Sequence, residues 1–374
     1  MSSVSQAKSR TSPPGGRTGR SGRRSPIEDS RERGSPRDAS DRPGRKRWLR
    51  PLSWLVLLLA GGGFVGVSLG RFDRGPDESP PAAGPIPARY DADRAFGYLV
   101  RLCDFGPRPT GSPGMERQRA FLEDFFRQRG AEVENQTTPI RHPLTGESVP
   151  MTNLIARWHP DRPKRFLLCA HYDTRPYPDR DRHNPRGVFV GANDGASGTA
   201  ALMELSHHLA DLPADVGVDI VLFDAEEFVF TEGRDEYFLG SIHFAQQYRM
   251  NPPRIPYRAG ILLDMVGDKE LVLLYERNSM RYARDVAVSL WQTAADLGVR
   301  AFVPRVRSQP IRDDHIPLNE IAGIPTIDVI DFDYPRPGFG APQYWHTEED
   351  TPDKCSGESL VAVVWVVHEW LRRQ

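Results

Sequence analysis

The sequence predicts an α/β fold: a three-layer α/β/α sandwich around a mixed, mostly parallel central sheet, preceded by a transmembrane helix. Three observations lead to this fold class. Short apolar runs, typical of buried strands, alternate with segments of helical periodicity between residues 90 and 374. Residues 52–70 form an uncharged stretch of about 19 residues, which is long enough to cross a bilayer. The length of 374 residues allows one large domain or two small ones.

The region 90–374 is expected to form one α/β domain, since helical and strand patterns follow one another along it. Helical periodicity occurs at 95–103, 116–129, 198–212, 279–297 and 359–371. Apolar runs that predict strands occur at 165–171, 219–224, 260–266, 271–275 and 326–330. Buried strands alternating with helices in this way are typical of a mostly parallel sheet.

The N-terminal segment predicts a single-pass membrane protein. Residues 1–47 are rich in Ser, Arg, Gly and Pro and have few large apolar side chains, so we expect a disordered basic tail. Basic residues lie just before the apolar stretch at 52–70, which places the tail in the cytoplasm and the catalytic domain in the periplasm or outside the cell. A cleaved signal peptide is the alternative. Residues 71–89, rich in Pro, Gly and Asp, are expected to be a linker.

Charge and cysteine content exclude several classes of protein. The formal net charge is −1 and the isoelectric point is near 6.8, so we expect no nucleic-acid partner; the predicted membrane contact is through residues 52–70. Cys103, Cys169 and Cys355 are too few and too scattered for a disulfide scaffold or a thiolate zinc site, and they allow at most one disulfide. The sequence leaves the oligomeric state open.

Acidic residues and a histidine follow four of the apolar runs. The run at 166–170 precedes His171, the run at 220–223 precedes Glu226 and Glu227, 261–263 precedes Asp264, and 190–193 precedes Asp194. Because ligands of open α/β sheets bind at the carboxyl ends of the strands, these side chains are expected to converge on one edge of the sheet.

This set of side chains is suited to zinc. A catalytic zinc site uses three protein ligands from His, Asp or Glu and leaves a fourth position for water or substrate. The adjacent Glu226 and Glu227 point in different directions, so one could bind the metal while the other moves protons. Each residue alone could instead be a helix cap or a solvated charge, and His346 alone could be a hydrogen-bonded core histidine.

Six ordered segments resemble the M28 family of zinc peptidases, and within it the glutaminyl-peptide cyclotransferases. They are Cys-Ala-His-Tyr-Asp at 169–173, Gly-Ala-Asn-Asp at 191–194, Phe-Asp-Ala-Glu-Glu at 223–227, Leu-Leu-Asp-Met-Val-Gly at 262–267, Asp-Asp-His-Ile-Pro at 313–317 and Trp-His-Thr at 345–347. The resemblance implies the fold of zinc exopeptidases.

The resemblance also implies roles for particular residues. Asp194, Glu227 and His346 would bind one zinc ion, and Glu226 would be the acid-base residue. Asp264 would be the partner of Glu226, Asp313 would hydrogen-bond to Asp264, and Trp345 would form a wall of the substrate pocket. Glu232 stands where similar cyclases have a pocket tryptophan.

The expected reaction converts the N-terminal glutamine of peptides or proteins to pyroglutamate with release of ammonia. An alternative is an aminopeptidase of the same family, in which His171 and Asp264 would bind a second zinc, Asp194 would bridge the two ions, and water would attack the first peptide bond. A third possibility is a membrane-anchored binding protein without activity.

Overall fold

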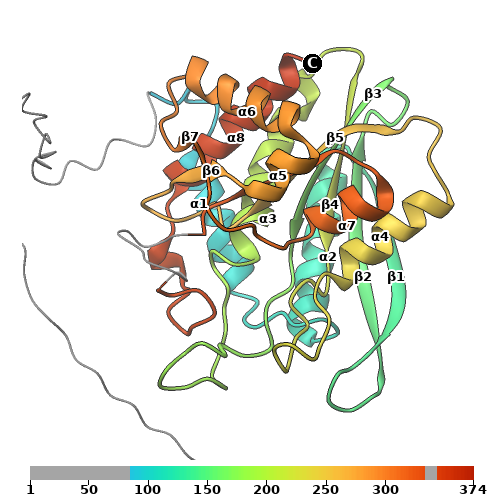
Figure 1. The fold of residues 1–374 in the computed structure, drawn as a ribbon, viewed down its shortest axis with the longest axis vertical. Coiled ribbons are helices and arrows are strands. Elements are labelled where there is room, and N and C mark those ends of the chain that lie inside the picture. The colour runs from blue at the N-terminus through green and yellow to red at the C-terminus, as the bar shows by residue number, and fades with distance from the viewer. Residues whose placement is uncertain (1–84, 333–342) are drawn as a thin grey trace, which may run out of the picture. The chain divides into compact units, whose positions relative to one another are not determined.

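A six-stranded mixed sheet forms the centre of the described structure (Figure 1). The structure is a computed structural model that describes residues 85–332 and 343–374. Every described residue belongs to one compact unit within residues 74–374. The strand order is β1-β2-β4-β3-β5-β8. The strands are β1 (Glu132–Arg141), β2 (Ser148–Trp158), β3 (Lys164–His171), β4 (Val216–Phe223), β5 (Tyr257–Asp264) and β8 (Thr326–Ile330).

Four neighbouring strands of this sheet are parallel, and β2 is antiparallel to both of its neighbours. The pairs β4–β3, β3–β5 and β5–β8 are parallel, whereas β2 pairs antiparallel with β4 and with β1. The prediction of an α/β fold with a mixed, mostly parallel central sheet is therefore confirmed. The carboxyl ends of β3, β4 and β5 lie at the same edge of the sheet, because parallel neighbours run in one direction.

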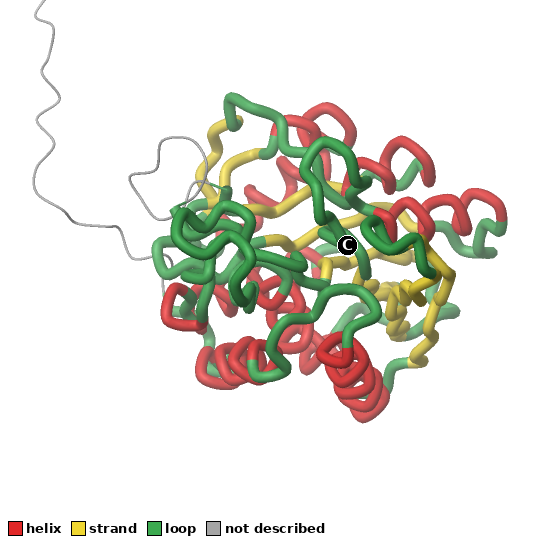
Figure 2. The backbone as a smooth tube through the Cα atoms, turned by 90° about the horizontal axis from the view of Figure 1, so that it is seen from below, coloured by secondary structure: helices red, strands yellow, loops and turns green. Residues whose placement is uncertain are grey.

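Helices cover both faces of the sheet, as Figure 2 shows with the strands between them. Successive residues of β3 point to opposite faces: Leu168 belongs to the larger hydrophobic cluster, and Leu167 and Cys169 to a smaller one. The larger cluster includes side chains of α1 (Ala92–Cys103), α2 (Pro113–Gln128), α3 (Ala196–Leu205), α6 (Arg284–Asp296) and α8 (Gly357–Arg372). The smaller cluster includes side chains of α4 (Leu239–Met250) and the helical turn η2 (Leu318–Ala322).

Side-chain caps define where several of these helices begin. Asp91 caps α1, Ser112 caps α2 and Ser356 caps α8, each by accepting a hydrogen bond from a backbone N–H of the first turn. The remaining elements are short: η1 (Ser206–Asp211), β6 (Leu273–Tyr275), α5 (Arg277–Tyr282), β7 (Phe302–Val306), α7 (His315–Pro317) and η3 (Pro352–Lys354).

Four features of the fold differ from the sequence prediction. The β1–β2 hairpin and α4 were not predicted, and the strand predicted at 271–275 forms a separate two-stranded parallel sheet, β6–β7, rather than part of the central sheet. Strand β1 has no buried residue and contains Pro139, so it lacks the apolar run that marks a central strand. The run at 190–193 is a loop that precedes α3, and Gly191 within it has φ +58°.

The prediction of a membrane-anchored protein with a periplasmic or extracellular catalytic domain is contradicted. Within residues 85–332 and 343–374, no helix has the length and apolar character needed to cross a membrane. The apolar stretch at 52–70, the basic tail at 1–47 and the linker up to residue 84 lie outside the described residues.

Candidate metal and catalytic site

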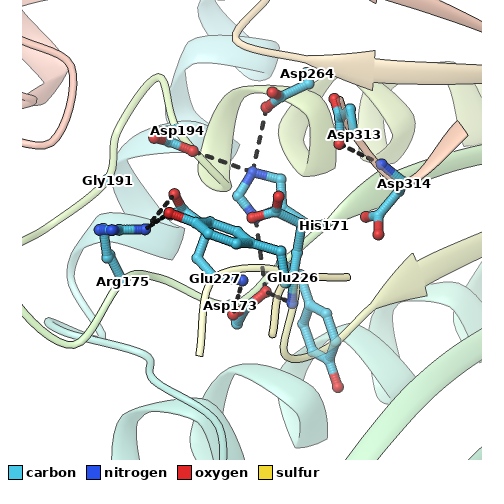
Figure 3. A network of polar contacts seen from close by, with 12 residues as sticks. His171, Asp173, Arg175, Gly191, Asp194, Glu226, Glu227, Asp264, Asp313 and Asp314 are labelled. Carbon is cyan, nitrogen blue, oxygen red and sulfur yellow. Dashed lines mark hydrogen bonds and ion pairs between the residues drawn. The ribbon is translucent and has the colours of Figure 1, made fainter. Parts of the chain in front are cut away.

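The charged residues that follow the apolar runs converge at the carboxyl edge of the sheet (Figure 3). His171 is the last residue of β3, Asp264 is the last residue of β5, and Glu226 and Glu227 lie in the loop after β4. Asp194 lies in the turn before α3 and not at the end of a strand, because the run that precedes it forms a loop. The strands place four of these side chains, and the start of α3 brings in the fifth.

Asp194, Glu227 and His346 form a buried group with the geometry of a metal site. The Nε2 atom of His346 lies 2.7 Å from Oε1 of Glu227 and 3.4 Å from Oδ2 of Asp194. Ligand atoms around a tetrahedral zinc lie about 3.3 Å apart, given metal-ligand bonds of about 2.0 Å. Within the described residues, Oδ2 of Asp194, Oε2 of Glu227 and Nε2 of His346 are buried and have no hydrogen-bond partner. A zinc ion would satisfy these atoms, so the residues fit the metal.

Two buried aspartates hold the backbone around this group. Asp173 accepts hydrogen bonds from the backbone N–H groups of Glu226 and Glu227, both at 3.1 Å. Asp350 accepts from the backbone N–H groups of Asn193 and Asp194, at 2.8 Å and 3.1 Å. Each aspartate therefore fixes a loop segment that carries one of the candidate metal ligands.

Strained backbone also marks this edge of the sheet. Ala225, Phe238, Met265 and His346 are non-glycine residues with φ between +46° and +64°. Ala225 precedes Glu226, and Met265 follows the last residue of β5. Such conformations cost of order 1–3 kcal/mol each and concentrate at functional sites.

Gly195, which caps α3 with φ +93°, stands where the backbone passes too close to its neighbours for a side chain. A Cβ atom at this position would lie 2.5 Å from the carbonyl oxygen of Asp173 and 3.2 Å from Cε1 of His171. The absence of a side chain therefore allows the turn that carries Asp194 to pass directly beside the imidazole of His171.

Arg175 and Asp179 form a clamp around two of the three candidate ligands. Oδ1 of Asp179 lies 3.4 Å from Nδ1 of His346, and both oxygens of Asp179 accept hydrogen bonds from the Arg175 guanidinium, at 2.9 Å and 2.8 Å. Nη1 of Arg175 lies 3.6 Å from Oε1 of Glu227, and the Arg175 side chain is 1% exposed. Sequence reasoning missed this pair, because both residues lie in a loop and neither follows an apolar run.

A second group of three could also hold a metal ion. Nε2 of His171 lies 3.2 Å from Oδ1 of Asp194 and 3.2 Å from Oδ1 of Asp264. The two groups share Asp194, whose other oxygen faces His346. The described geometry is therefore compatible with one ion or with two.

Glu226 lies beside the candidate ligands and has a shifted pKa. Burial, together with the negative charge of Glu227, raises the pKa of Glu226 well above its ordinary value, although His171 acts in the opposite direction. Around His346, burial lowers the pKa of the imidazole, but Glu227, Asp179 and Asp194 outweigh burial and raise it to about 10. The acids around His346 thus favour a positive charge at this position, which a metal ion would supply.

Asp313 lies near Asp264 but differs from the sequence prediction. Burial and the charges of Asp264 and Asp314 raise the pKa of Asp313. Its Oδ1 accepts the backbone N–H of Asp314 at 2.5 Å, and its Oδ2 has no hydrogen-bond partner among the described residues. The expected hydrogen bond between Asp313 and Asp264 is therefore absent from the described contacts. His315 of the same segment is fully buried, with Nε2 3.3 Å from Oε2 of Glu276.

A cavity of about 350 Å³ opens over these residues. Trp345 forms one side, with its ring centroid 4.9 Å from that of Phe332. Glu232 and Tyr237 also line the cavity; the Tyr237 hydroxyl donates to Glu232 at 2.5 Å, and Arg175 pairs with Glu232 at 3.1 Å. The lining residues also include Asp194, Glu226, Glu227, Phe238, Asp264, Met265, Arg307, Gln309, Pro310, Ile311, Arg312, Asp313 and Ile330.

Comparisons with known proteins found similar sequences and structures. The sequence profile described as Peptidase family M28 matches residues 153–371. A crystal structure of Fimbriiglobus ruber glutaminyl cyclase is 40% identical, covers 80% of this chain and 99% of its own, and has a TM-score of 0.71. The glutaminyl-peptide cyclotransferase of Gloydius blomhoffii is 28% identical over 68% of this chain and 73% of its own length. The structure of a Zn-dependent exopeptidase from Parabacteroides distasonis is 32% identical, covers 78% of this chain and all of its own, and has a TM-score of 0.69.

Proposed function

Because the chain belongs to peptidase family M28, we propose that it is a zinc-dependent enzyme that cyclises the N-terminal glutamine of peptides or proteins to pyroglutamate. The observation that carries the proposal is the buried group of Asp194, Glu227 and His346 at the floor of a cavity that Trp345 walls. The resemblance to glutaminyl cyclases extends over most of the catalytic region and supports this reaction over others.

The proposed metal ligands are Asp194, Glu227 and His346, and Asp179 and Arg175 orient them. When bound there, zinc supplies a Lewis acid that polarises the side-chain amide carbonyl of the substrate glutamine. The clamp acts on the imidazole through Nδ1 and leaves Nε2 for the metal, which is the arrangement that raises the basicity of a histidine ligand.

Glu226 is the proposed acid-base residue, since it lines the cavity and lies beside the candidate ligands. In the reaction, the α-amino nitrogen of the substrate forms a bond to the side-chain amide carbon, and the bond from that carbon to its own nitrogen breaks. Glu226 takes a proton from the attacking amine and gives it to the departing nitrogen, which leaves as ammonia. A carboxylate with a raised pKa is suited to this exchange, because a higher pKa makes it a stronger base.

Asp264 and Asp313, which line the same cavity, are proposed to support Glu226. Burial raises the pKa of both groups, and the repulsion between them adds to the shift of Asp313. Ionisation of both carboxyl groups at once is therefore disfavoured. A protonated carboxyl can donate a hydrogen bond, so this pair can help to hold the attacking amine or the departing nitrogen.

A zinc aminopeptidase is the second candidate, and the group of His171, Asp194 and Asp264 is the observation that favours it. A second ion held there would make Asp194 a bridging ligand, as in a two-metal hydrolase. The aromatic wall at Trp345 favours the cyclase, because it suits the small neutral side chain of glutamine.

Product analysis distinguishes the two reactions. The full chain, loaded with zinc, is incubated with glutamine-terminated peptides and the products are identified by mass spectrometry. We expect peptides that have lost one ammonia, and no free glutamine. Release of free N-terminal residues would replace the cyclase with the aminopeptidase. His171→Ala adds a second criterion: the proposed cyclase keeps its full zinc content in this variant, whereas the two-metal hydrolase loses one of its ions.

A further inference from the structure

The buried acidic side chains and the more exposed arginines of the active-site cavity lie at different depths. The acidic side chains of Asp194, Glu226, Glu227, Asp264 and Asp313 are all buried, so they lie at the floor. Arg312, which lines the same cavity, is exposed, and Arg307 is half-buried. The cavity is therefore acidic where the reaction takes place and has arginines nearer to solvent.

A third arginine contacts the aromatic wall of the same cavity. The guanidinium carbon of Arg180 lies 4.0 Å from the ring centroid of Trp345, which lines the cavity, and Arg180 is exposed. Among the residues that the structure describes, neither Arg180 nor Arg312 has a carboxylate within ion-pair distance. Both guanidinium groups thus remain available to a charge on a ligand.

The exposed acid of the cavity does not cancel these charges. Glu232 has a 64% exposed side chain, but it pairs with Arg175 at 3.1 Å and accepts the hydroxyl of Tyr237. Its charge is directed at the buried clamp behind the metal group. Among the described residues, Arg312 and Arg180 therefore add positive charge at the cavity and at its aromatic wall.

The reaction fixes which part of the substrate meets these arginines. In the proposed function, on which this inference depends, the α-amine and the side chain of the first residue are both consumed at the floor. The second and following residues must extend from the floor toward solvent, where Arg312 lines the cavity and Arg180 lies against the ring of Trp345. We propose that Arg312 and Arg180 select peptides that carry an acidic residue directly after the N-terminal glutamine.

The expected preference is modest, since the pairing takes place in solvent. An exposed ion pair contributes about 0.2–1 kcal/mol, which corresponds to a change of up to about fivefold in kcat/KM for one arginine. Salt weakens such pairs, because the Debye length falls to about 3 Å at 1 M ionic strength. The preference for acidic peptides should therefore shrink as salt is added.

The test compares three C-terminally amidated peptides that begin Gln-Glu, Gln-Ala and Gln-Lys and are otherwise identical, assayed with the full zinc-loaded chain. We expect kcat/KM to fall in the order Glu, Ala, Lys at low salt, with the Glu to Lys ratio approaching one at high salt. Arg312→Gln should lower this ratio about two- to fivefold, and Arg312→Lys should restore it. Arg254→Gln is the control, because Arg254 is exposed and lines a different cavity.

Each outcome bears on one proposal. Cyclisation of all three peptides at equal kcat/KM, or an unchanged ratio in an Arg312→Gln, Arg180→Gln double variant, would overturn the selection of acidic peptides and leave the cyclase intact. Absence of cyclisation for all three peptides would instead overturn the proposed function. Loss of turnover in Arg180→Gln with the Glu to Lys ratio retained would assign Arg180 to the support of Trp345 and remove it from the selection.

Discussion

Asp179 offers a direct test of how the protein holds its metal, because it contacts the candidate ligand His346 and also holds Arg175, which contacts Glu227. Its Oδ1 lies 3.4 Å from Nδ1 of His346, while Arg175 holds both of its oxygens. Partial burial raises the pKa of Asp179, but His346 and Arg175 lower it by more, so the carboxylate is ionised. Asp179→Asn keeps the size of the side chain and removes the charge, which weakens its hold on both partners.

The expected loss of zinc affinity follows from the role of carboxylates that hydrogen-bond to histidine ligands in metal sites. Loss of a carboxylate that orients a histidine ligand reduces metal affinity about 10- to 100-fold. This range corresponds to about 1.4–2.8 kcal/mol of binding free energy. We therefore expect Asp179→Asn to weaken zinc binding by that factor, measured by competition with a chromogenic chelator at fixed pH.

Two comparisons separate positioning from general damage. Asp161→Asn is the matched control, since the Asp161 side chain is 96% exposed and its ion-pair partner is Arg254, which is not a candidate metal ligand. Thermal unfolding of the metal-free proteins shows whether Asp179→Asn harms the fold itself. Zinc affinity within twofold of the wild type would refute the reasoning. A melting temperature that falls in the metal-free protein without a change in zinc affinity would refute it equally.

Three further predictions follow from the site and the core. Glu226→Gln should lower turnover about 10²- to 10⁴-fold with zinc content retained, and retained turnover would remove Glu226 from the mechanism. Because the pKa of Glu226 is raised, kcat/KM should fall as pH falls, with a midpoint above about 4.3, the ordinary value for glutamate; a midpoint at or below it would contradict this. Gly198→Ala should lower the free energy of unfolding by about 1–3 kcal/mol in denaturant unfolding, since the added Cβ would lie 2.1 Å from the Leu263 carbonyl oxygen. Gly97→Ala is the control: its Cβ would have open space around it, so this variant should raise the free energy of unfolding by up to about 1 kcal/mol.

The sequence predicted the position of those site residues that directly follow a buried strand. His171 and Asp264 end β3 and β5, so the apolar runs before them locate these residues at the carboxyl edge of a parallel sheet. Glu226 and Glu227 follow β4 in the same way. The fold class could be predicted for the same reason, because alternating buried strands and helices allow few arrangements.

Other parts of the site could not be predicted, because they depend on contacts between residues far apart in the sequence. Asp194 was expected at the end of a strand, but Gly191 and Gly195 turn its segment into a loop with positive φ values. The pair of Arg175 and Asp179 acquires its role only when His346, far along the chain, folds against it. The edge strand β1 lacks a buried face, so the period-2 signal that identifies strands is weak there.

Anomalous scattering at the zinc absorption edge, from crystals of the protein grown with zinc, tests the central claim most directly. The account predicts one strong peak at about 2.0–2.2 Å from a carboxylate oxygen of Asp194, a carboxylate oxygen of Glu227 and Nε2 of His346. A map with no peak between these three residues, in protein that retains zinc by elemental analysis, would contradict it.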